Sequence, residues 1–403
     1  MMKTFILVVY RANLRIVTAT ELLQPQILTA RYDKRFAAAR LFLTFTTGSP
    51  MKILYGVQGT GNGHVTRARI MAKAFAARGV AVDWVFSGRP REDFFDMEAF
   101  GDFQSYRGLT FAVKSGRILY LKTALQANLM QLNDDIKKVN VEGYDLIIND
   151  FEPVSAHAAK RAGKNVIGIS HQNAFLHKIP KKNNNLVTDW FMQNFAPVTQ
   201  AIGLHWHHFN QPILPPLIEP SHYSNDSLHK HYLVYLPFAG LDDIVPQLRK
   251  FPDYEFFVYQ NIPQPIDDGH IHIRPFSREG FQKDLHRCEG VICSAGFELP
   301  SEAIQLGKKL LVQPVAGQME QASNALALTQ LGYGSSTPIL NEAAIGRWLP
   351  LMKPAPIIYP NVADALVDWI LSTGGKNFDA FQKSLWEQVK TPQQMFTQNA
   401  ATN

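Results

Sequence analysis

The stretch MKILYGVQGTGNGHVTRARIMAKAFAARGVAVDWVFS (residues 51–87) decides the fold. Residues 52–57 are mostly apolar, as in a buried strand, and residues 64–78 carry apolar side chains at helical spacing. A second apolar run occupies residues 80–87. A strand, a helix and a strand in this order predict a βαβ unit in a parallel sheet.

The alternation continues beyond this unit. Strands are expected at residues 145–149 and 165–170, with a helix at 154–162 between them. Prolines crowd residues 211–220 and suit an extended linker, because they cannot continue a helix. A second series then begins, with strands at 232–236, 255–259, 270–274, 290–293 and 309–313 and helices at 242–250, 279–287 and 300–306.

Two alternating series predict an α/β protein with two doubly wound, Rossmann-like parallel-sheet domains that face each other across a cleft. We place the amino-terminal domain at 51–217 and the carboxyl-terminal domain at 218–349. Residues 350–403 form a tail whose helices, near 361–371 and 378–390, are expected to cross back to the first domain.

Residues 1–50 differ from the rest of the chain. They show no clean period, carry scattered arginines and end in Thr47-Gly48-Ser49-Pro50. Met51 then opens a strand in the way that many α/β proteins begin, so we interpret residues 1–50 as a non-native or disordered extension. An arginine-rich targeting peptide or a genuine flexible arm are the alternatives.

Composition and charge limit the class of protein and the ligands that we expect. The chain has 403 residues, 46% of them hydrophobic and 18% charged, which is typical of a large packed core. Its net charge of +6 is uneven: residues 1–50 contribute +5, residues 51–200 contribute +6 and residues 201–403 contribute −5. The basic first domain favours an acidic acceptor or an anionic membrane surface, and the charge gives little support to nucleic-acid binding.

Two cysteines, Cys288 and Cys293, cannot build a disulfide framework, and no early apolar run is long enough for a secretory or membrane-spanning segment. We therefore expect a cytoplasmic protein that rests peripherally on the inner face of the membrane.

A glycine loop joins the first strand to the first helix. It comprises Gly59, Thr60, Gly61, Asn62 and Gly63. Glycines allow close approach to a ligand, and the N–H groups of a helix start favour an anion. The spacing is not the Gly-x-Gly-x-x-Gly of dinucleotide binding, and no acidic residue closes the second strand, which disfavours an NAD enzyme.

Polar side chains follow several strand ends of the first domain. His64 follows the glycine loop, and imidazole is well suited to take a proton near neutral pH. Asp150 and Glu152 follow another strand, where either carboxylate could orient His64 or act as a base, while helix capping is the structural alternative. His171 ends the next strand and is expected to face a ligand in the cleft. Arg67, one turn beyond His64, is expected to meet a phosphate or an acidic ligand, with a solvated helix face as the alternative.

A second constellation lies at Ser294-Ala295-Gly296-Phe297-Glu298-Leu299-Pro300-Ser301-Glu302-Ala303. Here a strand leads through a glycine turn into a helix, which directs N–H groups towards a phosphate. Glu302 lies about one turn along the helix and could accept hydrogen bonds from two ribose hydroxyls; a helix capping box is the alternative. After the next strand, Gln318, Glu320, Gln321 and Asn324 supply polar groups that suit a hydroxyl-rich ligand.

These two motifs, in this order, resemble the GT-B fold glycosyltransferases, with the peptidoglycan lipid-intermediate N-acetylglucosaminyltransferase and the UDP-glycosyltransferases as the nearest groups. The resemblance covers residues 51–349 and is strongest over 291–334. It implies transfer of a sugar from a nucleotide-sugar donor, with UDP as the nucleotide, to a hydroxyl acceptor, with inversion.

The resemblance implies that residues 51–217 form the acceptor-side domain, with Arg67 and His171 on the acceptor side, and that residues 218–349 form the nucleotide-sugar-binding domain. It also implies roles for individual residues. His64 matches the base or acceptor-orienting group, Glu302 the acid that binds the donor ribose, and Gly296 the glycine beside the diphosphate. Glu320 and Gln321 match the pair that contacts the sugar hydroxyls. Two residues depart from the family pattern: Ser294 stands where His or Arg is common, and Leu299 where a small hydroxyl residue is common.

We expect no metal and no other cofactor. The chain has no Asp-x-Asp motif, and its three His-x-His pairs, at 205/207, 229/231 and 270/272, have no recurring acidic partner. A nucleotide-sugar 2-epimerase of the same fold and a non-catalytic nucleotide-sugar-binding protein are the alternative functions. An epimerase would turn over without an acceptor, and a binding protein would not turn over.

Overall fold

A computed structural model describes residues 5–10, 13–18, 51–109, 113–114, 117–118 and 129–391. It divides the chain into two compact units, Met1–Ser49 and Pro50–Asn403. In the first unit, β1 (Phe5–Tyr10) pairs with β2 (Asn13–Thr18) as an antiparallel hairpin. The sequence analysis did not predict this hairpin.

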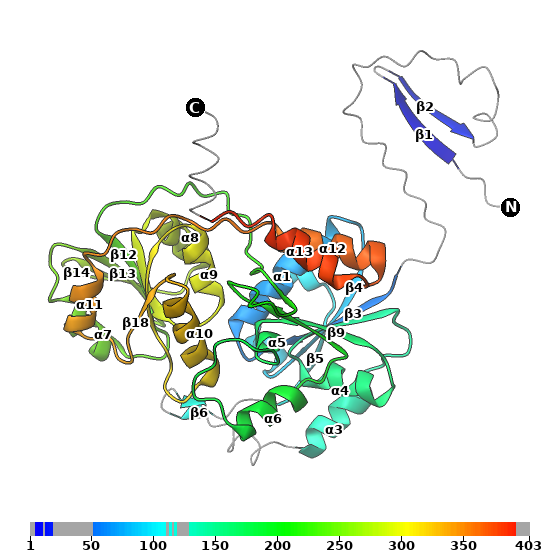
Figure 1. Cartoon of the computed structure of the whole chain (residues 1–403), viewed down its shortest axis with the longest axis horizontal. Helices are drawn as coiled ribbons and strands as arrows, with labels where there is room; N and C mark the ends of the chain where they lie inside the picture. The colour runs from blue at the N-terminus through cyan, green and yellow to red at the C-terminus, as the bar shows by residue number, and fades with distance from the viewer. Residues whose placement is uncertain are drawn as a thin grey trace. The chain divides into compact units, whose positions relative to one another are not determined.

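The second unit contains two seven-stranded sheets (Figure 1). The first has the order β11-β10-β9-β8-β3-β4-β5, and all its neighbouring strands are parallel. Its strands are β3 (Ile53–Gln58), β4 (Val82–Ser87), β5 (Gln104–Tyr106), β8 (Leu146–Asp150), β9 (Val166–Ser170), β10 (Gln200–Leu204) and β11 (Ile213–Leu214). Its helices are α1 (Asn62–Ala76), α3 (Leu129–Lys138), α4 (Pro153–Arg161), α5 (His171–Ala174) and α6 (Leu186–Asn194). Two 3₁₀ turns lie at Arg91–Asp93 and Glu98–Phe100, and β6 (Val113–Lys114) and β7 (Arg117–Ile118) form a short separate hairpin.

The second sheet has the order β14-β15-β13-β12-β16-β17-β18 and is parallel except for β14. Its strands are β12 (His231–Tyr235), β13 (Glu255–Tyr259), β14 (Ile266–Asp268), β15 (Ile271–Arg274), β16 (Gly290–Ser294), β17 (Lys309–Gln313) and β18 (Ser335–Ser336). The helices between them are α7 (Leu241–Leu248), α8 (Arg278–Arg287), α9 (Glu298–Gln305), α10 (Met319–Gln330) and α11 (Glu342–Trp348).

Alternate side chains of β3 enter different cores because successive strand residues face opposite sides of a sheet. Ile53, Tyr55 and Val57 join the core beneath α1, whereas Leu54 packs with α3 and α4. Gly56 lets α4 approach the strand, since a Cβ there would lie 2.0 Å from Oγ of Ser155. Both faces of the sheet are thus covered, as the apolar run in the sequence predicts.

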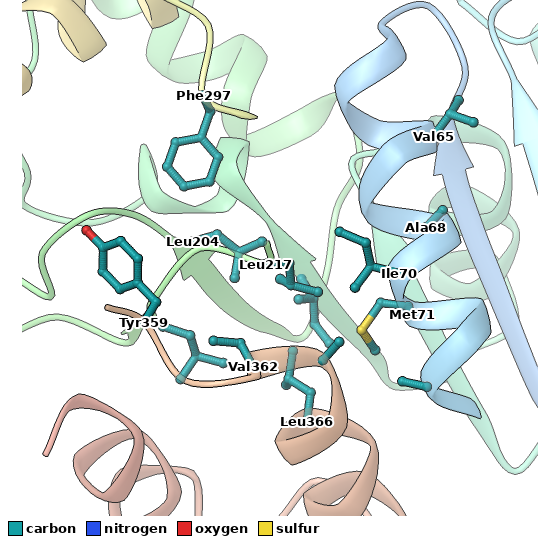
Figure 2. Close-up of a cluster of buried hydrophobic side chains, with 14 of the residues drawn as sticks. Val65, Ala68, Ile70, Met71, Leu204, Leu217, Phe297, Tyr359, Val362 and Leu366 are labelled. Atoms are coloured by element: carbon teal, nitrogen blue, oxygen red, sulfur yellow. The ribbon is translucent and has the colours of Figure 1, made fainter. Parts of the chain in front are cut away.

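The carboxyl-terminal helices pack on the first sheet's side of the unit. α12 (Val362–Thr373) lies along α1, and Arg78, just beyond the end of α1, donates to Asp364 and Asp368 of α12 (Figure 1). In α13 (Phe378–Trp386), the indole N–H of Trp386 donates to the carbonyl of Ile213. Figure 2 shows the shared core of this region, in which side chains of α1 and α12 meet Leu204, Leu217 and Phe297. This core also includes residues of the second sheet, so the two sheets share buried apolar contacts.

The proline-rich segment differs from its prediction as a linker. Ile213 and Leu214 are fully buried and form β11, the edge strand beside β10. Prolines flank these two residues, and an edge strand tolerates flanking prolines because its outer N–H groups have no strand partner. The chain leaves the first sheet only after this strand.

Candidate active site

The ends of β3 and β8 bring His64 and Asp150 together. Asp150 is the last residue of β8, and His64 lies in the first turn of α1, directly after the glycine loop. The Nδ1 atom of His64 lies 2.8 Å from Oδ1 of Asp150, and the Asp150 side chain is 1% exposed. A carboxylate only accepts, so the bond to Asp150 requires the tautomer with the proton on Nδ1, which leaves Nε2 as the basic nitrogen of the neutral ring. The Nη2 atom of Arg67, which only donates, also lies 2.8 Å from Nδ1 and competes for this nitrogen. No residue in the described part of the chain hydrogen-bonds Nε2.

Arg67 fixes the carboxylate from the other side. Its Nε donates to Oδ2 of Asp150 at 2.9 Å and its Nη2 to Oδ1 at 2.8 Å, which is a bidentate pair. Burial opposes ionisation of Asp150, but the charges of Arg67 and His64 outweigh it and lower the pKa of Asp150. Asp150 is therefore an anion that holds the His64 ring in one orientation.

Glu298, the first residue of α9, completes this group from the second domain. Arg67 Nη1 donates to Oε1 of Glu298, so an ion pair links α1 to α9. The side chain of Glu298 also covers Gly63, where a Cβ would lie only 3.1 Å from its Cγ. Burial raises the pKa of Glu298 to about 7, although Arg67 opposes the shift.

The glycine loop is shaped by neighbouring side chains. A Cβ at Gly59 would lie 2.5 Å from the ring of Phe94, and the Gly59 N–H bonds the Ser87 carbonyl at 2.6 Å. No side chain caps α1 at Gly61 and no acidic residue occupies its first turn. The Thr60 hydroxyl is buried without a hydrogen-bond partner among the described residues. This uncapped helix start leaves N–H groups available to an anion.

Glu152 has different partners from Asp150. It is the N-cap of α4 and accepts from the N–H groups of Val154 and Ser155 at 2.6 and 2.7 Å. The Ser87 hydroxyl donates to it at 2.6 Å. Burial raises the pKa of Glu152. The structure thus brings Asp150, and not Glu152, to His64, and Glu152 takes the capping role that the sequence left open.

His171 is fully buried where the two sheets' elements meet. Its Nε2 lies 2.8 Å from Oδ1 of Asn324, its Nδ1 lies 2.8 Å from the Leu204 carbonyl, and its ring stacks on Phe297 with centroids 4.0 Å apart. Asn324 also donates to the Ala295 carbonyl at 3.0 Å. The expected open-cleft positions of His171 and Asn324 are therefore replaced by a buried contact between the two residues.

The remaining donor-side residues divide into two groups. Gln321 is buried and accepts from the Val315 N–H at 2.9 Å, so it holds the loop before α10 and does not face a ligand. Glu302 accepts from Gln282 at 2.8 Å, and burial raises its pKa to about 6. Glu320 accepts from Gln172 at 3.1 Å.

Three further positions stay accessible at the start of α9 and α10. Ser294 ends β16 and is half-buried, and a Cβ built at Gly296 would meet no atom within 4 Å. Gln318 is the half-buried N-cap residue of α10 and makes no side-chain cap. Space beside Gly296 is therefore available next to an uncapped helix start.

Sequence comparison identifies the family. The model of glycosyl transferase family 1 matches residues 51–352, which is most of the chain. The chain belongs to glycosyl transferase family 1. It is therefore an enzyme that transfers glycosyl groups, and the match begins at Met51, as does the resemblance drawn from the motifs. No curated protein matches the transferase significantly.

Solved structures support the GT-B fold of the transferase. The glycotransferase of kitacinnamycin is 15% identical with a TM-score of 0.54, over 84% of this chain and 100% of that chain. The calicheamicin glycosyltransferase CalG4 is 15% identical with a TM-score of 0.50, over 75% and 89%. The Streptomyces sp. SF2575 glycosyltransferase SsfS6, complexed with thymidine diphosphate, is 11% identical with a TM-score of 0.50, over 87% and 99%. The predicted fold class is confirmed.

The sequence analysis missed Glu298 in this glycosyltransferase. Glu298 lies inside the quoted Ser294–Ala303 motif, but an acidic residue at a helix start is common because it suits the helix dipole. Its ion pair with Arg67 joins residues 231 positions apart, which no local pattern indicates. Among the described residues no group of three His, Cys, Asp or Glu side chains could hold a metal ion.

Proposed function

We propose that the transferase moves a sugar from a nucleoside diphosphate donor, with UDP as the nucleotide, to a hydroxyl acceptor, with inversion and without a metal ion. The observation that supports it is the Asp150–His64 pair. His64 lies in the first turn of α1, and Arg67, which contacts its Nδ1 atom, pairs with Glu298 of the second domain. A base held at a junction of two domains suits transfer between a donor on one and an acceptor on the other.

In the proposed reaction, Nε2 of His64 takes the proton from the acceptor hydroxyl as its oxygen attacks the anomeric carbon. The bond between that carbon and the diphosphate oxygen breaks, and the diphosphate leaves with the electron pair. One displacement inverts the anomeric centre. Asp150 keeps the imidazole oriented, as the acid of a catalytic triad does.

The donor diphosphate would bind beside Gly296, at the start of α9. This helix has no side-chain cap, so its N–H groups can stabilise the leaving phosphate without a metal. Glu302 would accept hydrogen bonds from the ribose hydroxyls. At the start of α10, Glu320 would accept from the sugar hydroxyls, and Gln318 would donate to them or accept from them. Ser294 would donate to a phosphate oxygen.

Two exposed phenylalanines supply a platform for the nucleobase. Phe238 and Phe276 are 60% and 53% exposed and follow the ends of β12 and β15. Phe276 also lies 6.0 Å from the ring of Tyr235. Large aromatic rings left open at the carboxyl edge of a parallel sheet suit stacking on a planar base.

A thermal-shift panel tests donor binding. UDP-glucose, UDP-N-acetylglucosamine, TDP-glucose and GDP-mannose would each be added with and without EDTA. A ligand that binds the folded protein at about 100 times its dissociation constant stabilises it by about 2.7 kcal/mol. We expect a UDP-sugar to raise Tm equally with EDTA present; a shift that EDTA abolishes would contradict metal independence.

Transfer and its stereochemistry test the role of His64. His64→Ala is expected to lower kcat for the donor selected in the panel by about 10²- to 10⁴-fold. Proton NMR of the product anomer should show inversion. A fully active His64→Ala enzyme would refute the base role, and product formed from donor alone would favour an epimerase.

We further propose that the acceptor side rests on an anionic membrane. None of the helices in the described part of the chain is long and apolar enough to cross a membrane. On α6, however, Leu186, Val187 and Trp190 are 87%, 54% and 62% exposed, and the segment just before it carries Lys178, Lys181 and Lys182. Exposed apolar side chains beside lysines suit the interface of an anionic bilayer.

Vesicle sedimentation tests this contact. The protein should sediment with phosphatidylglycerol vesicles and not with phosphatidylcholine vesicles, and Trp190→Ala should weaken binding several-fold. Ile339→Ala is the matched control, because Ile339 is 68% exposed on the second domain and has no lysine within ten residues along the chain. Equal loss in both variants would contradict a specific contact through α6.

A further inference from the structure

The pair of Arg67 and Glu298 changes the charge beside the proposed base. Arg67 is 4% exposed and its guanidinium contacts three side chains: Asp150 through two bonds, Glu298 through Nη1, and His64, whose Nδ1 lies 2.8 Å from Nη2. Asp150 and His64 belong to the first domain, whereas Glu298 belongs to the second. The first domain alone therefore holds only part of this group.

The charges can be counted for each part. Within the first domain, the carboxylate of Asp150 and the guanidinium of Arg67 cancel, so they give His64 little net stabilisation when it gains a proton. Glu298 adds a second carboxylate and makes the surroundings of His64 net negative by one. A negative group near an imidazole favours its protonated form.

We propose that Glu298 is a positioning residue of the transferase that strengthens His64 as a base only when the second domain is closed on the first. The donor-binding domain would thus deliver the charge that activates the base on the acceptor side. A sugar donor bound in an open cleft would meet a weaker base, which limits transfer to water. The inference rests on the proposed role of His64.

Glu298 is surrounded by groups that make its charge depend on pH. Arg67 pairs with it from α1, Asp150 acts on it from β8, and Glu302 acts on it from its own helix. Its pKa of about 7 results mainly from burial. Above this pH the side chain is an anion and pairs with Arg67. Below it, the neutral acid resembles a glutamine, and the extra negative charge is lost.

Glu298→Gln tests the proposal because it keeps the shape and removes the charge. With the donor selected from the panel of four nucleotide sugars, we expect kcat at pH 8.5 to fall by about 10- to 100-fold, with KM for the donor changed by less than about threefold. The ratio of native to variant kcat should approach one at pH 5.5, since Glu298 is then protonated. A ratio that stays constant with pH would overturn the proposal.

A double-mutant cycle with His64→Ala shows whether Glu298 acts through His64. If it does, Glu298→Gln should have no further effect once His64 is replaced. Equal fold-losses in both backgrounds would show an independent role, such as closing the cleft, and would overturn the proposal. A fully active His64→Ala enzyme would instead refute the base role itself, so the two failures are distinguishable.

Glu219→Gln is the matched control. Glu219 also connects α1 to the second domain, because it pairs with Lys73 of α1 and with Arg278 of α8. It lies outside the hydrogen bonds of His64. Its replacement should leave kcat and its pH profile unchanged, and far-ultraviolet circular dichroism of all variants checks folding. A loss in Glu219→Gln equal to that in Glu298→Gln would overturn the proposal.

Discussion

Two glutamates join helix α1 to the second domain, and their pKa values move in opposite directions. Glu298 pairs with buried Arg67, and burial raises its pKa to about 7. Glu219 pairs with exposed Lys73 and Arg278; burial opposes these pairs, but they prevail and lower its pKa. Burial of the pair therefore costs stability at the amino-terminal end of α1, whereas the exposed pairs supply stability at the other end.

The difference follows from solvation. The side chain of Glu298 is 17% exposed and that of Arg67 is 4% exposed, so both ions lose water when the pair forms. The Lys73 and Arg278 side chains are 60% and 49% exposed and keep much of their hydration. A buried ion pair loses solvation free energy, so we expect it where its charge serves a function. The position beside the proposed base, His64, fits this expectation.

Asp150→Asn should break the buried cluster most severely. The variant leaves Arg67 with one carboxylate partner in place of two, and removing one member of a buried ion pair typically destabilises a protein by about 3–5 kcal/mol. We expect a loss of that size in the free energy of unfolding, measured with urea at pH 8. His64 also loses its orienting anion, so kcat should fall at least as far as in Glu298→Gln.

The control for this prediction is Asp364→Asn. Asp364 pairs with Arg78, which lies just beyond the end of α1, and the Asp364 side chain is 46% exposed. This variant should lose less than about 1 kcal/mol, as expected for a surface pair. Equal losses of unfolding free energy in the two variants would mean that the buried pair and the exposed pair contribute equally to stability.

The contrast between the two clusters shows what the sequence can predict. The apolar periods of residues 51–87 predict β3, α1 and β4, because burial on both faces of a parallel sheet imposes that pattern. The same logic predicts that His64 and Asp150 meet, since both follow carboxyl ends of neighbouring parallel strands. Local patterns therefore predict the fold and the first-domain half of the site.

Contacts between the domains could not be predicted in this way. Glu298 is the first residue of α9, and Gln321 and Asn324 lie in the first two turns of α10. One of them pairs with Arg67, one holds its own loop and one bonds His171. Which of these occurs depends on how the two domains meet, and no periodicity contains that information. The buried edge strand β11 was missed for a related reason: prolines mark its ends, but only the neighbouring β10 makes it a strand.

The pH dependence of stability gives a sharper comparison of the two glutamates. A carboxyl whose folded pKa is raised ionises first in the unfolded chain, so its contribution to the free energy of unfolding falls as pH rises from about 4.5 to about 7. Glu298→Gln removes this contribution. The variant should therefore gain about 1–3 kcal/mol relative to the native protein between pH 4.5 and pH 7.5, measured by urea unfolding across that range.

This gain would accompany a loss of activity, as expected where a functional charge is held at a cost in stability. A difference between variant and native protein that does not change with pH would show that Glu298 carries no burial penalty. Glu302, whose pKa is raised to about 6, contributes with the same sign in both proteins and so cancels from the difference.

Glu219→Gln should have the smallest effect and the opposite pH dependence. The folded pKa of Glu219 is lowered, so its contribution to stability is present above pH 4.5 and is lost as pH falls through the folded value. Because its partners are exposed, we expect a loss of at most about 1 kcal/mol at pH 7, measured by urea unfolding. Raising the salt concentration to about 1 M should remove most of it, since screening then acts over about 3 Å. A loss that survives 1 M salt would show that Glu219 stabilises the protein by packing and not by charge.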